Sequence, residues 1–69
     1  MLGGEKMLSE NLKHYREKKG YSKLKLARKT GLSARCIEHI EYRKSINPRI
    51  ETLNKIANVL DVSIEELIK

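Results

Sequence analysis

The chain has 69 residues, of which 35% are charged, and a formal net charge of +6, so it fits one small domain. Its single cysteine excludes an intrachain disulfide and a cysteine-rich metal site. No stretch is long or apolar enough for a membrane-spanning helix, and no secretory signal peptide is recognisable. We therefore expect a folded domain that works in the cytoplasm under reducing conditions.

The basic residues concentrate in the middle of the sequence. Residues 22–49 contain eight Lys and Arg against two acidic residues, whereas residues 1–21 balance at +2 and residues 50–69 at −2. A basic protein in general does not need this asymmetry, but an element that binds a polyanion does. The distribution therefore predicts a polyanionic partner for the central segment.

Helical spacing of apolar residues runs through most of the chain, while no strand-like alternation and no internal repeat is present. Residues 1–7 contain the pair Gly3-Gly4 and little to bury, which indicates a flexible leader. Residues 8–69 are expected to form one compact, all-α domain of five helices.

The first helix is predicted over residues 8–19. Leu8, Leu12 and Tyr15 recur at spacings of four and three and give this helix one apolar face. Gly20 follows directly and suits the left-handed conformation that commonly ends a helix.

Two short helices, over residues 22–29 and 33–41, are predicted next, with only a tight turn between them. Ser22 and Ser33 are good N-cap residues, and Gly31 can take the positive φ that a tight turn requires. A helix, a three-residue turn and a second helix is the spacing of a helix-turn-helix unit.

The last two helices also carry start signals. Asn47 as N-cap, followed by Pro48 at the first helical position, predicts the start of the fourth helix. The apolar stripe of that helix consists of Leu53, Ile56, Ala57 and Leu60. Ser63 with Glu66 has the form of a capping box and opens a short fifth helix, with Leu67 facing inward.

The third helix has an outward side suited to reading DNA bases. At about 100° per residue, Ile37 and Ile40 mark its buried side and Cys36 lies at the edge of that side. The outward side carries Ala34, Arg35, Glu38, His39 and Tyr42. Arg can donate two hydrogen bonds to guanine, a methyl group such as that of Ala can contact the thymine methyl, and Glu can accept from cytosine.

Other functions need residues that the sequence lacks. Its two histidines and one cysteine form no metal-ligand cluster, and no nucleophile–base–acid set or glycine-rich phosphate loop is present. We therefore expect no enzyme activity, no cofactor and no small-molecule ligand.

The exposed charged residues also have a simpler interpretation. A single exposed Arg or His is compatible with an ordinary solvated surface, and Lys25, Arg28 and Lys29 are compatible with charges that serve solubility.

A family resemblance rests on residues spread from about residue 12 to residue 67. They are Leu12-x-x-Tyr15-Arg16, Gly20-Tyr21-Ser22, Leu26-Ala27, Gly31-Leu32-Ser33, Ile37-x-x-Ile40-Glu41, Asn47-Pro48, Glu51-Thr52-Leu53, Ile56-Ala57, Leu60-x-Val62-Ser63 and Leu67. In these residues the chain resembles the lambda-repressor-like (Cro/CI) helix-turn-helix family. The resemblance implies a compact five-helix domain with the helix-turn-helix at its second and third helices. It also implies sequence-specific binding to double-stranded DNA by a homodimeric transcriptional regulator of the repressor type.

Site residues follow from the resemblance. The positions that contact bases fall on Ala34, Arg35, Glu38 and His39. The positions that contact phosphates fall on Lys23, Ser33, Arg43 and Lys44. A partly buried structural ion pair is implied between Arg16 and Glu41. The family usually has Gln where this chain has Lys23, so a plain ionic contact is expected there, with loss of a side-chain bridge to the recognition helix.

Two other functions stay open on the sequence. One is a protein-interaction module on the same fold, such as an antitoxin or the partner of another regulator, although the basic outward side argues against it. The other is non-specific RNA or chromatin binding, for which three Tyr provide few stacking groups. Dimerisation is expected through Ile64, Leu67 and Ile68, or only on DNA, and the chain is also compatible with a fragment of a larger regulator.

Overall fold

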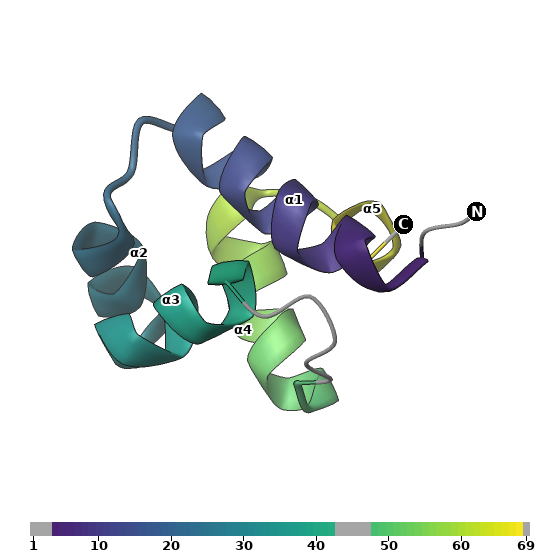
Figure 1. Cartoon of the computed structure of the whole chain (residues 1–69). Coiled ribbons are helices and arrows are strands. Elements are labelled where there is room, and N and C mark those ends of the chain that lie inside the picture. Colours follow the sequence, from purple (N-terminus) through teal and green to yellow (C-terminus); the bar gives the residue numbers. More distant parts are fainter. Residues whose placement is uncertain (1–3, 43–47, 69) are drawn as a thin grey trace.

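The computed structural model describes residues 4–42 and 48–68, with side chains from residue 8 onward. This part of the chain contains helices and no strand, which confirms the predicted all-α class (Figure 1). The helices are α1 (Gly4–Lys18), α2 (Lys23–Thr30), α3 (Ala34–Tyr42), α4 (Ile50–Leu60) and α5 (Ile64–Ile68). In the described part, no helix has both the length and the apolar character needed to cross a membrane.

The helix-turn-helix geometry of α2 and α3 is set by local caps. Ser22 Oγ accepts a hydrogen bond from the backbone N–H of Lys25 at 3.0 Å, and Ser33 Oγ accepts one from Cys36 at 3.1 Å. Gly31 ends α2 in the left-handed conformation, with φ +79°. Both predicted N-caps and the predicted turn glycine are therefore confirmed.

α1 starts earlier than the sequence predicted. It begins at Gly4, whereas the first helix was predicted to begin at residue 8. Extension of an existing helix adds one hydrogen bond for each residue that is ordered. Residues 5–7 are Glu, Lys and Met, which have high helix propensity, and this propensity accounts for the extra turn.

α4, in contrast, starts later than predicted. Its first residue is Ile50 and its N-cap is Arg49, whose side chain makes no capping hydrogen bond. Pro48 precedes the helix, so its assignment to the first helical position was wrong, and Asn47 lies outside the described residues. The φ of proline also suits extended backbone, while Glu51 in the first turn supplies the negative charge that favours a helix start at Ile50.

The capping box of α5 is confirmed. The N–H of Glu66 donates to Ser63 Oγ at 3.0 Å, and the N–H of Ser63 donates to Glu66 Oε1 at 2.9 Å. Asn11 of α1 holds the other end of this short helix, because its side-chain amide donates to the carbonyl of Leu67 at 3.0 Å. α5 is therefore anchored to α1 through its backbone as well as its apolar face.

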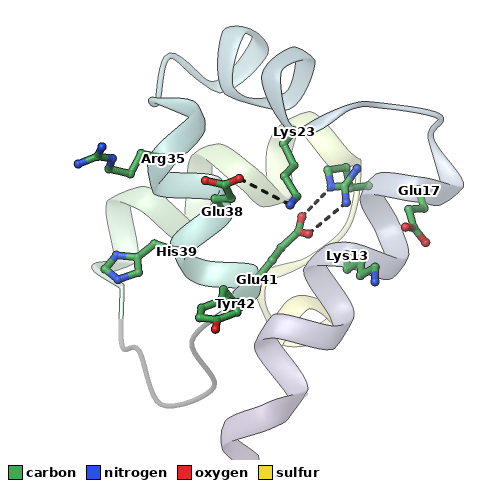
Figure 2. A pocket seen from close by; sticks show the side chains of 9 residues that line it. Lys13, Glu17, Lys23, Arg35, Glu38, His39, Glu41 and Tyr42 are labelled. Atoms are coloured by element: carbon green, nitrogen blue, oxygen red, sulfur yellow. Dashed lines mark hydrogen bonds and ion pairs between the residues drawn. The ribbon is translucent and has the colours of Figure 1, made fainter.

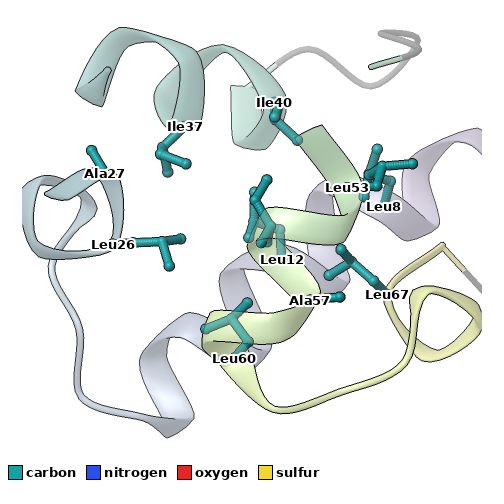
Figure 3. Close-up of a cluster of buried hydrophobic side chains, with 11 residues drawn as sticks. Leu8, Leu12, Leu26, Ala27, Ile37, Ile40, Leu53, Ala57, Leu60 and Leu67 are labelled. Atoms are coloured by element: carbon teal, nitrogen blue, oxygen red, sulfur yellow. The ribbon is translucent and has the colours of Figure 1, made fainter. Parts of the chain in front are cut away.

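All five helices contribute to one hydrophobic core (Figure 3). Its buried members are Leu8, Leu12, Leu26, Ala27, Ile37, Ile40, Leu53, Ile56, Ala57, Leu60 and Leu67. These include the apolar positions predicted to face inward except Tyr15, which is only partly buried against the core. α3 packs on both α1 and α2, while α4 packs on α2 and α5.

One member of this core corrects a prediction about dimerisation. Leu67 is fully buried inside the monomer, so it is not available for a contact between two copies of the chain. Ile64 is partly buried against the core, whereas Ile68 remains 44% exposed. Of the three predicted dimer residues, Ile68 offers the most apolar surface.

Candidate nucleic-acid interface

The orientation of α3 is fixed by its two isoleucines. Ile37 and Ile40 are buried, and the opposite side of the helix exposes Arg35, Glu38, His39 and Tyr42 (Figure 2). Ala34 differs from the prediction, because it is partly buried against the core. The reason is its spacing of three residues from Ile37, which places both residues on neighbouring positions of the helix surface.

The outward side of α3 borders a hollow that extends to α1 (Figure 2). The residues that line it are Lys13, Arg16, Glu17, Lys23, Arg35, Glu38, His39, Glu41 and Tyr42. Arg35, Glu38, His39 and Lys23, which the sequence had placed in the site, thus come together. Across residues 8–42 and 48–68, no group of three or more His, Cys, Asp or Glu is placed to hold a metal ion.

Three residues of this hollow, Lys13, Glu17 and Tyr42, were missing from the predicted site. Tyr42 is 83% exposed at the end of α3; the helical projection had put it on the outward side, one residue beyond the predicted end of the helix. Lys13 comes from α1. No local pattern could have identified Lys13, because its position beside α3 depends on how two helices far apart in sequence pack.

The ion pair between Arg16 and Glu41 joins α1 to the end of α3. Arg16 Nε lies 2.6 Å from Glu41 Oε2 and Arg16 Nη2 lies 3.1 Å from Glu41 Oε1, with side-chain exposures of 9% and 6%. Arg16 Nη1 also donates to the carbonyl of Tyr21 at 2.8 Å. This hydrogen-bonded carboxylate raises the pKa of Arg16, although burial acts in the opposite direction. The guanidinium therefore positions α3 against α1 and the turn before α2.

A second ion pair, in the hollow itself, corrects a prediction about Lys23. Lys23 Nζ lies 3.9 Å from Glu38 Oε2, and the two side chains are 44% and 64% exposed (Figure 2). The expected loss of a side-chain bridge from this position to the recognition helix was therefore wrong. The long lysine stem carries its charge to an acidic residue in the middle of α3. Because both groups are solvated, the pair is weak.

Of the predicted phosphate-contacting residues, Lys23 and Ser33 lie in the described part of the chain. Ser33 is exposed at the start of α3. Its oxygen accepts the capping hydrogen bond from Cys36, which leaves the hydroxyl hydrogen available as a donor. Arg43 and Lys44 lie outside the described residues.

The remaining basic residues of α2 line a different hollow. Lys25, Arg28 and Lys29 line a second hollow together with Ser22 and Leu24. Lys25 Nζ and Lys29 Nζ lie 5.7 and 5.4 Å from the centre of the Tyr21 ring. Among the described residues, the basic side chains of α2 are therefore divided between two hollows.

Comparisons with known proteins agree with this fold. A family model described as helix-turn-helix matches residues 12–67. The HTH-type transcriptional regulator SinR of Bacillus subtilis (strain 168) is 40% identical over 62 residues, which are 90% of this chain and 56% of SinR. The regulator SlrR of the same organism is 34% identical over 61 residues, which are 88% of this chain and 40% of SlrR. The chain thus spans about half the length of these curated relatives.

Solved structures give the same result at the level of the fold. A crystal structure of SinR, described as the master regulator for biofilm formation, in complex with DNA superposes with a TM-score of 0.86 at 40% identity, covering 91% of this chain and 100% of that one. A hypothetical transcription factor, NHTF from Neisseria, has a TM-score of 0.85 at 30% identity, covering 96% of this chain and 75% of that one. The chain therefore belongs to the helix-turn-helix family of Cro/CI type that its sequence resembles.

Proposed function

We propose that the protein binds double-stranded DNA in a sequence-specific manner and acts as a transcriptional regulator of the repressor type, with α3 in the major groove. The observation that carries the proposal is the exposure of Arg35, Glu38 and His39 on one side of α3, beside a hollow that also holds Lys13 and Lys23. The relatives named as transcriptional regulators, one of them solved with DNA, support it.

Base recognition is assigned to the outward side of α3. Arg35 can donate two hydrogen bonds to guanine, and Glu38 can accept one from the amino group of cytosine. His39 reaches base edges from the same side of the helix. Ala34, which is partly buried, offers only its methyl group, and we assign it an apolar contact with a thymine methyl at the edge of the site.

Phosphate contacts are assigned to groups around α3. Lys23, Ser33, Arg43 and Lys44 are the positions that the family resemblance implies, and Lys13 joins them because it lines the same hollow. Cations near the phosphates release counterions and supply much of the affinity. Phosphate contacts also set the orientation of the recognition helix on the duplex.

Binding as a homodimer, at least on DNA, fits this class of protein, which reads two half-sites about one helical turn apart. Ile68 at the end of α5 is the exposed apolar residue that we assign to the contact between copies. The proposal requires no cofactor, small-molecule ligand, membrane or catalytic group, and it places the protein with the DNA in the cytoplasm.

The test is fluorescence anisotropy with a random-sequence duplex across a salt series. If Lys13, Lys23, Arg43 and Lys44 each neutralise one phosphate, log K falls against log salt with a slope of about −3.6. A response that is independent of salt would contradict DNA binding.

Two variants separate the assigned roles once bound sites have been selected from a random DNA pool. Arg35→Ala relaxes sequence preference, because it removes a base contact. Lys44→Ala weakens binding to all sequences about equally and reduces the salt slope by about one. Identical behaviour of the two variants would show that the roles are wrongly assigned.

A further inference from the structure

The hollow beside α3 contains an acidic group in a place where a DNA-binding surface is expected to be basic. α3 carries two carboxylates, Glu38 and Glu41, which differ in burial and in hydrogen bonding. Glu41 is nearly buried and is held by two hydrogen bonds from Arg16. Glu38 lies on the outward side with 64% of its side chain exposed, and its contact with Lys23 is 3.9 Å long.

Bringing a duplex against this surface removes water from Glu38 and sets it among phosphates and base edges. A carboxylate that loses its hydration without a donor in exchange is strongly destabilised. Lys23 offsets this cost only in part, because the pair is long, solvated and therefore weak. Glu38 thus opposes binding unless the DNA itself supplies a hydrogen-bond donor.

The major groove supplies such donors only at particular places. Cytosine presents the amino group N4 as its one polar group there, whereas adenine places the acceptor N7 beside its amino group N6, and guanine O6 and N7 and thymine O4 are acceptors that face a carboxylate unfavourably. Whether Glu38 meets a donor therefore depends on the base that lies directly opposite it. Arg35, three residues earlier on the same side of α3, has the opposite requirement and favours acceptors.

We propose that Glu38 sets the DNA specificity of this protein by exclusion: its carboxylate admits cytosine at one position of each half-site and penalises DNA that offers acceptors there. This inference rests on the proposed function, because it requires α3 to lie in the major groove. A base contact that only adds affinity would favour the correct sequence. Glu38 instead raises the free energy of binding to sequences that place an acceptor opposite its carboxylate, and this penalty produces the discrimination.

The variant that tests the proposal is Glu38→Gln, which keeps the shape of the side chain and removes its charge. Glutamine can both donate and accept, so it tolerates acceptor bases. Affinity for random-sequence duplex is expected to rise by about fivefold, the factor that corresponds to one unit-charge interaction at contact distance in water. The preference for cytosine at the affected position is expected to fall by about fivefold or more.

The matched control is Glu17→Gln. Glu17 lines the same hollow, but it lies on α1 and not on the outward side of α3 (Figure 2). Its replacement changes the net charge of the protein by the same amount. It is expected to raise affinity for selected and random duplexes alike, and so to leave their ratio unchanged.

The experiment uses duplexes selected by the wild-type protein, their single-base variants and a random duplex, with anisotropy measured at constant salt. The expected result is an increase in random-duplex affinity in both variants, with a loss of discrimination at one position in Glu38→Gln alone. Equal effects of the two variants, or an unchanged ratio in Glu38→Gln, would overturn the inference while leaving DNA binding intact. Absence of DNA binding by the wild-type protein would overturn the proposed function and this inference with it.

Discussion

Replacement of Glu41 by Gln tests whether the Arg16–Glu41 pair holds the recognition helix in place. Gln keeps the size of the side chain, but one of its two terminal groups is a donor and so faces a donor of the guanidinium. Arg16, whose side chain is only 9% exposed, would retain its hydrogen bond to the carbonyl of Tyr21 and lose the charge that compensates it. We therefore expect a large loss of stability.

The magnitude follows from the geometry of the pair. Two charge-assisted hydrogen bonds, with lengths of 2.6 and 3.1 Å, contribute about 1.5–3 kcal/mol each. Breaking a buried ion pair by removing one partner costs about 3–5 kcal/mol, because the bond lost at the amide nitrogen adds to the charge of Arg16 that is left without compensation. For a domain of this length, each kcal/mol lowers the melting temperature by about 4–8 °C, so Glu41→Gln should lower it by at least about 12 °C.

Urea denaturation followed by far-UV circular dichroism measures this effect as a lower midpoint with an unchanged slope. Glu38→Gln is the control, because it removes a partner of the exposed pair with Lys23 and should change the free energy of unfolding by less than about 1 kcal/mol. Equal effects of the two replacements, or a loss below about 1 kcal/mol for Glu41→Gln, would refute the argument that burial gives the first pair its importance.

The pH dependence of this pair has a defined sign. Because the pKa of Arg16 is raised in the folded protein, its contribution to stability is present below the unfolded pKa and is lost only as the pH rises through the folded value. Both values lie in the strongly alkaline range. Titration of Arg16 therefore leaves stability unchanged around neutral pH, and a loss that begins near neutrality would have to come from other groups.

Three further predictions test the burial of Leu67, the positive φ of Gly31, and the placement of Lys23 and Lys25 in two different hollows. Leu67→Ala should lower the free energy of unfolding by about 2–5 kcal/mol, whereas Ile68→Ala should cost less than about 1 kcal/mol; equal losses in urea titrations would contradict the burial of Leu67 in the monomer. Gly31→Ala should cost about 1–2 kcal/mol in thermal melts, because an added Cβ meets no atom within 4 Å and the penalty comes from the positive φ alone. Lys23→Gln should weaken binding to random duplex more than Lys25→Gln does, since Lys25 lines the other hollow; similar losses in anisotropy would argue for one continuous basic surface.

The sequence by itself determined the features that depend on neighbouring residues. Ser22 and Ser33 cap backbone groups three residues away, and Gly31 meets a backbone requirement at its own position. Ile37 and Ile40 lie one turn apart, so the buried side of α3 followed from the helical repeat. The pair of Arg16 and Glu41 was expected only because the chain resembles a known family, since 25 residues separate its partners along the chain.

Only the tertiary structure decided the features that depend on how separate helices pack. Lys13 lines the hollow beside α3, Lys23 contacts Glu38, and Lys25 lines a different hollow. Leu67 is fully buried because α5 packs on α1 and α4. Helical periodicity specifies the direction of a side chain around its own axis, but the distance between side chains on two helices depends on the crossing and separation of the helices, which are set by the shared core.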